Sequence, residues 1–124
     1  MTRTAKEIFI KGFTIERAKA AVVEWFAENS VKVLIDNVDY VYGRLGRGIL
    51  TSPKFFEVTI VPVAGGVIGK TEGWIANIPP SFLPDARAYL PETEFSESAR
   101  VLGGIPRKQG MQAMRRLWDT LEAL

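Results

Sequence analysis

Residues 54–78, which read KFFEVTIVPVAGGVIGKTEGWIANI, constrain the fold more than any other part of the chain. Apolar and polar residues alternate on both sides of Gly65 and Gly66, and a two-residue glycine loop suits the primed turns that join hairpin strands. We therefore predict an antiparallel hairpin. Its predicted pairs are Ala64 with Val67, Val58 with Gly73, and Phe56 with Ile75.

The two faces of this hairpin differ in character, because successive side chains of a strand point to opposite faces. One face is predicted to lie in the core and the other has a mixed composition that includes two carboxylates. The predicted core face carries Phe56, Val58, Ile60 and Ile75. The mixed face carries Phe55, Glu57, Thr59, Lys70, Glu72 and Trp74.

Two helices and a further strand are predicted outside the hairpin. Residues 4–10 alternate and favour a strand, and Thr14 is a good N-cap for an amphipathic helix over residues 15–29. Near the end of the chain, Pro106 fits the first position of a second helix. The apolar stripe of that helix comprises Met111, Met114, Leu117, Trp118, Leu121 and Leu124.

Residues 31–44 change the parity of their apolar positions. Val31, Val33 and Ile35 share one parity, whereas Val38, Tyr40 and Tyr42 share the other. A bulge near residues 36–37 would give one long bent strand, and a tight turn there would give a hairpin. Between these alternatives we favour the bent strand.

Residues 77–104 do not fit a long strand or helix, since four of the seven prolines lie there. A loop of this length in a compact domain is usually a lid, a binding loop or a disordered segment. This one is rich in Phe, Leu and Tyr, which favours a loop that packs against something. Whether it is a lid or an interface stays open at this point.

The order β-α-β-β-β-α predicts a single α+β domain over residues 1–124, with an antiparallel sheet and both helices on one face. In the order of its elements the chain resembles helix-grip and TATA-binding-protein-like domains. In composition it resembles uncharacterised archaeal proteins, since it is rich in Val, Ile, Arg and Glu, and free of Cys. That resemblance implies a thermophile.

The absence of cysteine and histidine excludes several chemistries. Disulfides, thiolate catalysis, Cys-ligated metals, the usual zinc ligand and the Ser–His–Asp triad all require one of these residues. We expect no cofactor and no resident metal. The net charge of +2 is small for a nucleic-acid-binding protein, and neither a membrane span nor a signal peptide is evident, so we expect a cytoplasmic protein.

A basic set of residues is one candidate site. Gly103 and Gly104 precede a helix whose first turn carries basic residues, and helix N-termini attract anions. A second basic loop lies beside Tyr40 and Tyr42, where arginines could follow a nucleic-acid backbone, and Arg115 and Arg116 could extend that surface. The candidates for anion or nucleic-acid binding are Arg44, Arg47, Gly104, Arg107 and Lys108.

Carboxylates on the predicted strands are a second candidate. A buried carboxylate near Tyr40 or Tyr42 could act as a general base beside a phenol donor. If Glu57 and Glu72 share a face, they could also ligate a hard metal. The alternative is that these carboxylates, together with Asp36 and Asp39, mark the wet face of the sheet.

An apolar set is the third candidate. Trp25 and Trp118 fall on helix faces expected in the core, whereas Trp74 and Phe55 lie on the mixed face and need a covering loop or a partner. The candidate pocket or interface comprises Phe55, Trp74, Phe82, Tyr89 and Phe95. We therefore expect a non-enzymatic binding module that forms a homodimer. A nucleic-acid-associated protein and a small carboxylate–tyrosine enzyme are the alternatives.

Overall fold

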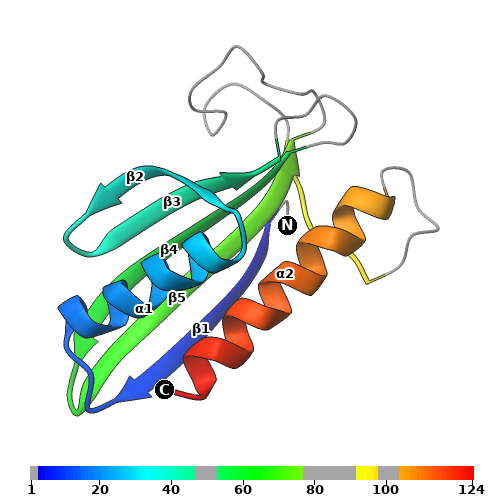
Figure 1. The fold of residues 1–124 in the computed structure, drawn as a ribbon. Helices are drawn as coiled ribbons and strands as arrows, with labels where there is room; N and C mark the ends of the chain where they lie inside the picture. The colour runs from blue at the N-terminus through cyan, green and yellow to red at the C-terminus, as the bar shows by residue number, and fades with distance from the viewer. Residues whose placement is uncertain (1–2, 47–52, 77–91, 98–103) are drawn as a thin grey trace.

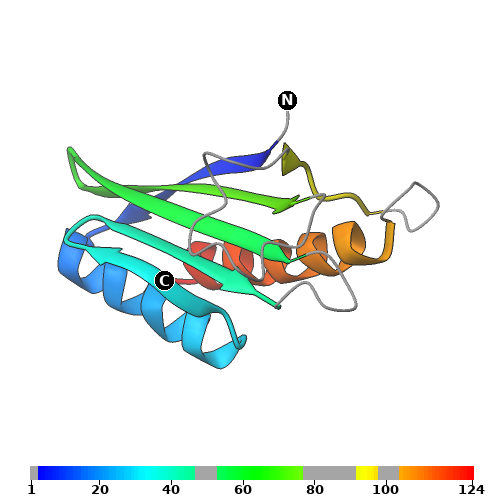
Figure 2. The same ribbon diagram turned by 90° about the horizontal axis from the view of Figure 1, so that it is seen from above.

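The computed structural model describes residues 3–46, 53–76, 92–97 and 104–124, and these form two layers (Figures 1 and 2). One layer is an antiparallel sheet, and both helices cover the same face of it, as predicted. The elements are β1 (Thr4–Lys11), α1 (Ile15–Glu28), β2 (Lys32–Asn37), β3 (Tyr40–Leu45), β4 (Lys54–Val63), β5 (Gly66–Ala76), β6 (Glu92–Thr93) and α2 (Gly104–Glu122). The chain therefore has the α+β fold that its sequence pattern predicts.

The strands of the sheet lie in the order β1-β5-β4-β3-β2. The N-terminal strand thus pairs with β5, far away in the sequence, over the stretch in which Thr4 lies opposite Gly73 and Lys11 opposite Gly66. The short strand β6 pairs with the following residues of β5, Ile75 and Ala76. Strand β1 and strand β6 therefore lie one after the other along the same side of β5.

The β4–β5 hairpin is confirmed, but its register is two residues away from the predicted one. The turn is at Ala64 and Gly65, so that Val63 lies opposite Gly66 and Phe56 opposite Gly73. Contacts with β1 accompany this register: the Gly12 N–H donates to the Gly65 carbonyl at 2.8 Å, and a Cβ on Gly66 would collide with the Ile10 carbonyl. Because side chains repeat every two residues, both faces keep their predicted residues.

Residues 32–45 form a hairpin, so the preference for one bent strand was wrong. The turn lies at Val38 and Asp39, and the Asp39 carbonyl accepts a hydrogen bond of 2.8 Å from the Ile60 N–H of β4. A bulge does occur, but within β2, between Val33 and Ile35. The neighbouring strand β4 thus supplies a hydrogen-bond donor for a backbone carbonyl of the turn, which favours a reversal of the chain here.

Both helices pack an apolar stripe on the sheet. The Thr14 side chain caps α1 by accepting a hydrogen bond from the Arg17 N–H. Helix α2 begins two residues before Pro106, which is therefore its third residue rather than its first. The stripe is confirmed through Leu121, but Leu124 is 44% exposed because the helix ends at Glu122. Among the described residues, neither helix is long and apolar enough to span a membrane.

Most of the 77–104 segment lies outside the described residues, including Phe82 and Tyr89. Within it the structure describes residues 92–97 and the start of α2 at Gly104. Strand β6 carries Glu92 to the sheet, and the Phe95 N–H donates to the Thr4 hydroxyl at 2.9 Å.

Candidate functional site

The face of the sheet opposite the helices, which we name the open face, carries the polar groups of interest. Strand alternation assigns it side chains from β1, β3, β4 and β5, and cross-strand pairing arranges them in rows. One row runs Glu7, Lys70, Thr59 and Tyr40; the next runs Ala5, Glu72, Glu57 and Tyr42; and a third brings Trp74 beside Phe55 and Arg44.

Arg3 joins three carboxylates from three strands on this face. Its Nε and one terminal nitrogen donate to both oxygens of Glu92, at 2.8 and 2.7 Å. Its other terminal nitrogen donates to Glu57 at 2.9 Å and to Glu72 at 3.1 Å. The Tyr40 hydroxyl donates to the second oxygen of Glu57 at 2.6 Å. We call Arg3, Tyr40, Glu57, Glu72 and Glu92 the Arg3 cluster.

The protonation of this cluster follows from burial and from the short distances. Hydrogen bonding to Glu92 raises the pKa of Arg3 further above its already high value. Burial raises the pKa of Glu57, and the neighbouring Glu72 carboxylate raises it further, against the opposing effects of Tyr40 and Arg3. The pKa of Glu72 is lowered, chiefly by its hydrogen bond with Glu57 and also by Arg3. The pKa of Glu57 is thus raised while that of Glu72 is lowered, so Glu57 takes up a proton more readily than Glu72.

Three aromatic rings stack beside this cluster. The rings of Tyr42 and Phe55 lie 5.9 Å apart at 9°, and those of Phe55 and Trp74 lie 5.8 Å apart at 20°. The Arg3 guanidinium lies 3.8 Å from the centre of the Trp74 ring, close enough for a cation–π interaction. All three rings are at most 1% exposed. The aromatic row thus supports the Arg3 cluster from one side.

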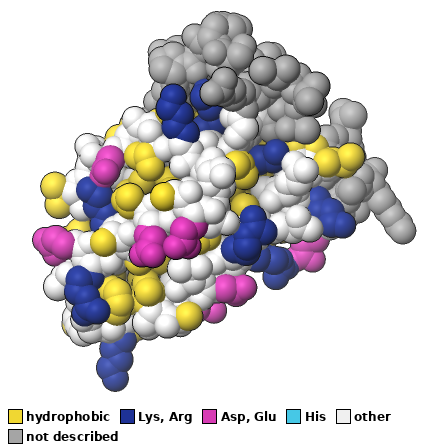
Figure 3. Space-filling view, in the orientation of Figure 1, with side chains coloured by type: hydrophobic (Ala, Val, Ile, Leu, Met, Phe, Trp, Pro, Cys, Tyr) yellow, Lys and Arg dark blue, Asp and Glu magenta, His cyan; other side chains and the backbone are white. Residues whose placement is uncertain are grey.

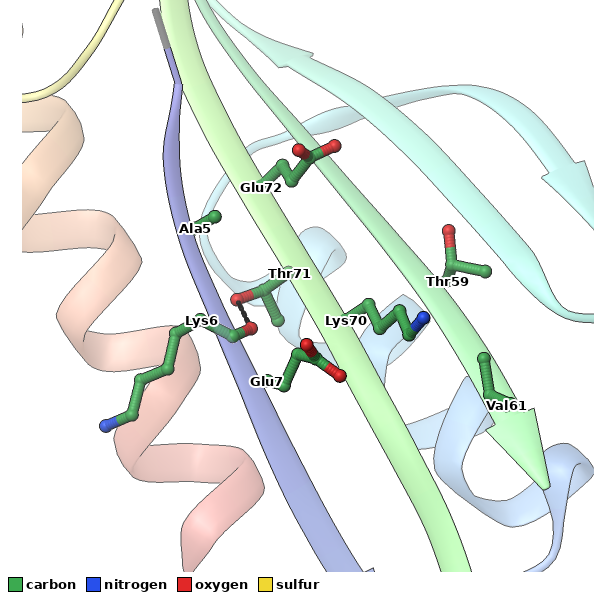
Figure 4. A pocket seen from close by; sticks show the side chains of 8 residues that line it. All are labelled: Ala5, Lys6, Glu7, Thr59, Val61, Lys70, Thr71 and Glu72. Carbon is green, nitrogen blue, oxygen red and sulfur yellow. Dashed lines mark hydrogen bonds between the residues drawn. The ribbon is translucent and has the colours of Figure 1, made fainter. Parts of the chain in front are cut away.

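A groove of about 500 Å³ lies on the open face next to the cluster (Figure 4). The strands β1, β4 and β5 contribute its walls, and Glu7, Lys70 and Glu72 supply charges of both signs. Its lining comprises Ala5, Lys6, Glu7, Thr59, Val61, Lys70, Thr71 and Glu72. Two of these point away from the open face: Thr71 donates to the Lys6 carbonyl at 2.7 Å, and Lys6 pairs with Glu122 of α2.

Glu7 and Lys70 both line this groove, on directly paired positions of the neighbouring strands β1 and β5. In Figure 4 the Lys70 amine extends towards Thr59 and Val61 rather than towards Glu7. Among the described residues neither side chain has an ion pair. The groove therefore offers an anionic and a cationic group to a ligand.

The predicted contact between a strand carboxylate and a tyrosine is confirmed by Tyr40 and Glu57. Glu57 and Glu72 also share a face, directly opposite each other. Within the described part of the chain, however, no group of three acidic side chains is arranged to hold a metal ion. The Arg3 guanidinium instead supplies the positive charge between these carboxylates.

The basic candidates do not form one surface. Arg44 lies on the open face opposite Phe55, whereas α2 covers the other face. Arg107 donates to the Glu94 carbonyl at 2.8 Å, and Lys108 lines a separate cavity of about 210 Å³. Figure 3 shows Lys and Arg side chains interspersed with acidic ones on the helix-covered face. Arg47 lies outside the described residues.

The apolar candidates divide between the two faces. Phe55 and Trp74 come together as predicted, and they are buried rather than forming an exposed patch. Phe95 was wrongly grouped with them, because it packs on the helix-covered face with its ring 5.5 Å from that of Phe56. Its backbone hydrogen bond to Thr4 holds it there, above the space left by Gly73.

Arg3 and Glu92 are the site residues that the sequence analysis missed. They are 89 residues apart, and neither lies in a motif. One signal was present: Arg3 has the same parity as Ala5 and Glu7 on a predicted strand, which directs it to the mixed face.

Comparison with known proteins places few further limits on this site. No family model matches the chain, and no curated protein matches it. It is similar to a solved structure of a DUF4468 family protein from Bacteroides ovatus, with 11% sequence identity over 94% of this chain and 82% of that chain and a TM-score of 0.41. That neighbour comes from a bacterium.

Proposed function

We propose that the protein is a small, non-enzymatic binding module whose ligand lies in the groove on the open face. The observation that carries the proposal is the pair Glu7 and Lys70, which are charged, line the groove from neighbouring strands and have no ion pair among the described residues. A ligand with one cationic and one anionic group, such as a short peptide, complements them. Val61 and Ala5 add apolar contact area to the same groove.

The state of Glu57 supports binding rather than catalysis. Both of its oxygens already accept hydrogen bonds, one from Arg3 and the other from Tyr40. A general base needs a free oxygen within reach of a substrate proton. The Arg3 cluster accordingly acts as the support that holds Glu72 at the edge of the groove.

The proposal includes self-association into a homodimer. Large apolar side chains stand exposed on the open face, with Phe9 at 52% and Val63 at 37%. The surface first expected for this role, around residues 77–104, has its described members Phe55 and Trp74 buried. The proposed contact therefore lies on the exposed part of the open face.

Titration of a dipeptide into the isotope-labelled protein tests the ligand site. We expect amide resonances of β1, β4 and β5 around the groove to shift at millimolar dipeptide. We expect Glu7→Gln and Lys70→Gln each to weaken the effect. Lys32→Gln, on the far edge strand β2, is the matched control and should leave it unchanged. Shifts that are absent, or equal in all variants, would overturn the site.

Light scattering at low and high salt tests the homodimer. A dimeric mass at both salts is expected, since apolar contacts carry most of the interface free energy. A monomer at every concentration would refute this part of the proposal. Salt-sensitive retention on DNA or RNA would favour a nucleic-acid-associated protein instead.

An archaeal, thermophilic source and a cytoplasmic location remain parts of the proposal that rest on composition alone. The high Val, Ile, Arg and Glu content supports the first, and the lack of cysteine is compatible with the second. An unfolding midpoint in the range of mesophilic domains, about 45–65 °C, would argue against a thermophile.

A further inference from the structure

Strand β1 forms an edge of the sheet that is open to pairing. It pairs with β5 on one side, and no other described strand pairs with it. Its register runs without a bulge from Thr4 to Lys11, and it contains no proline. The opposite edge strand, β2, is interrupted by a bulge between Val33 and Ile35, a feature that discourages pairing with another chain. The β1 edge lacks that protection.

The sequence of this edge is complementary to itself when read in the antiparallel direction. Residues 7–11 are Glu-Ile-Phe-Ile-Lys. Two copies paired antiparallel about Phe9 bring Glu7 of one copy opposite Lys11 of the other, twice. They also bring Ile8 opposite Ile10, twice, and Phe9 opposite Phe9. Opposite charges, aliphatic pairs and aromatic pairs at directly facing positions all stabilise antiparallel strands.

Other registers of the same strand are less favourable. Pairing about Glu7 would place two Glu7 carboxylates directly opposite each other, which is destabilising. Pairing about Ile8 would place Glu7 opposite Phe9 and Lys6 opposite Ile10, so that charges face apolar side chains. The charges therefore select the register centred on Phe9.

The environment of these side chains fits an interface. Phe9 is 52% exposed, and it is the one aromatic side chain that is exposed in the described part of the chain. It points to the open face. Glu7 and Lys11 are exposed on the same face and have no ion pair among the described residues. Ile8 and Ile10 already lie in the core beneath the helices. Pairing would cover Phe9 and neutralise both charges without disturbing that core.

We infer that β1 is the homodimer interface of this protein, and that two copies pair antiparallel about Phe9 to join their sheets into one. The inference rests on the homodimer of the proposed function and names its surface. A two-fold axis perpendicular to the sheet leaves the helices of both copies on the same side. The two grooves then lie on one continuous open face. Glu7 takes part in both the interface and the groove, and Glu72 is the carboxylate of the groove that the interface leaves unused.

Cysteine cross-linking tests the interface directly, because the natural chain has no cysteine. In an antiparallel pair, facing Cα atoms are about 4.5–5.5 Å apart, within the range of a disulfide. We expect Phe9→Cys to form a covalent dimer under mild oxidation. Val63→Cys, at an exposed apolar position of the same face, is the matched control and should not. Glu7→Cys should cross-link with Lys11→Cys when the two are mixed, and poorly with itself.

A charge swap tests the register without a covalent bond. Glu7→Lys alone and Lys11→Glu alone each replace two attractive pairs with two repulsive ones. We therefore expect each to raise the dissociation constant of the dimer roughly tenfold or more. The double variant Glu7→Lys/Lys11→Glu restores both pairs and should restore the dimer. Recovery in the double variant also shows that the single variants still fold.

The outcomes separate the inference from the proposed function. A wild-type protein that stays monomeric would refute the homodimer and this interface together. If the wild type is a dimer, but the charge reversals leave the dimer intact and Phe9→Cys does not cross-link, the homodimer stands and β1 is refuted as its interface. Equal cross-linking of Phe9→Cys and Val63→Cys would likewise refute the specific pairing.

Discussion

Replacing Arg3 with alanine would remove the one described cation between the three carboxylates of the Arg3 cluster. The Arg3 side chain is 22% exposed, and it faces Glu57 and Glu92 at 13% and 15% exposure and Glu72 at 40%. Breaking a buried ion pair by removing one partner costs about 3–5 kcal/mol. Partial exposure lowers this figure, because water screens the remaining charges. We expect Arg3→Ala to reduce the free energy of unfolding by about 2–4 kcal/mol at neutral pH.

Urea denaturation followed by circular dichroism measures this loss, and urea avoids the ionic screening that guanidinium would add. Arg17→Ala is the matched control: it removes the same charge from an exposed arginine that lies 4.2 Å from the Phe13 ring. Its expected cost is below about 1 kcal/mol. Arg3→Lys keeps the charge but not the paired hydrogen bonds to Glu92, and should fall between the two.

The dependence of the loss on pH tests its electrostatic origin. The pKa of Glu72 is lowered in the folded protein, chiefly by Glu57 and also by Arg3, so the stability that the Arg3 contact contributes is present above the ordinary pKa of 4.5 and is lost as pH falls. The cost of Arg3→Ala should therefore shrink in acid. A cost at neutral pH no larger than that of Arg17→Ala, or one that does not change with pH, would refute this reasoning.

Four further substitutions test the pKa assignment and the packing. Because the folded-state pKa of Glu57 is raised, ionising this carboxyl lowers the free energy of unfolding as pH rises above 4.5. Over that range the free energy of unfolding of Glu57→Gln, measured in urea, should therefore increase relative to that of the wild type. Glu72→Gln should do the opposite, since its pKa is lowered: its deficit should be largest at neutral pH and disappear in acid. Gly73→Ala should cost about 1–3 kcal/mol, because its Cβ would collide with the Phe95 ring, whereas at Gly69 on the same face the nearest atom is 3.7 Å away and alanine should be tolerated. Equal unfolding free energies for the two alanine variants would contradict the packing described.

Alternation predicted the faces of the sheet more reliably than it predicted register. A strand pattern repeats every two residues, so an error of two positions in the β4–β5 hairpin changed no side chain's face. In the observed register, Gly65 and Gly66 contact β1, a strand that is distant in the sequence. A local pattern contains no information about such a neighbour.

The β2–β3 turn was harder to predict because its residues are atypical. Val38 is 73% exposed and has a strong preference for strands, which favoured an unbroken strand on local grounds. The hydrogen bond from Ile60 to the Asp39 carbonyl connects this turn with β4. The tertiary contact prevailed over the local preference.

About half of the Arg3 cluster could be predicted. Glu57 and Glu72 lie on strands with clear alternation, so their common face followed from parity, whereas Tyr40 was expected only as one of two possible phenol neighbours of a carboxylate. Glu92 lies in a segment without periodicity, and Arg3 lies before the first strand. Only the fold brings these two residues to the same place.

The long sequence separations within the Arg3 cluster also set the order in which the protein assembles. Arg3 closes loops of 54, 69 and 89 residues to Glu57, Glu72 and Glu92. The β4–β5 hairpin, by contrast, closes through two turn residues and can form early, whereas contacts distant in sequence must first overcome the entropy of loop closure. We therefore expect the cluster to form after the folding transition state, so that its free energy slows unfolding rather than speeding folding. In stopped-flow experiments Arg3 would set how long the native protein survives, while leaving the rate at which it is reached almost unchanged.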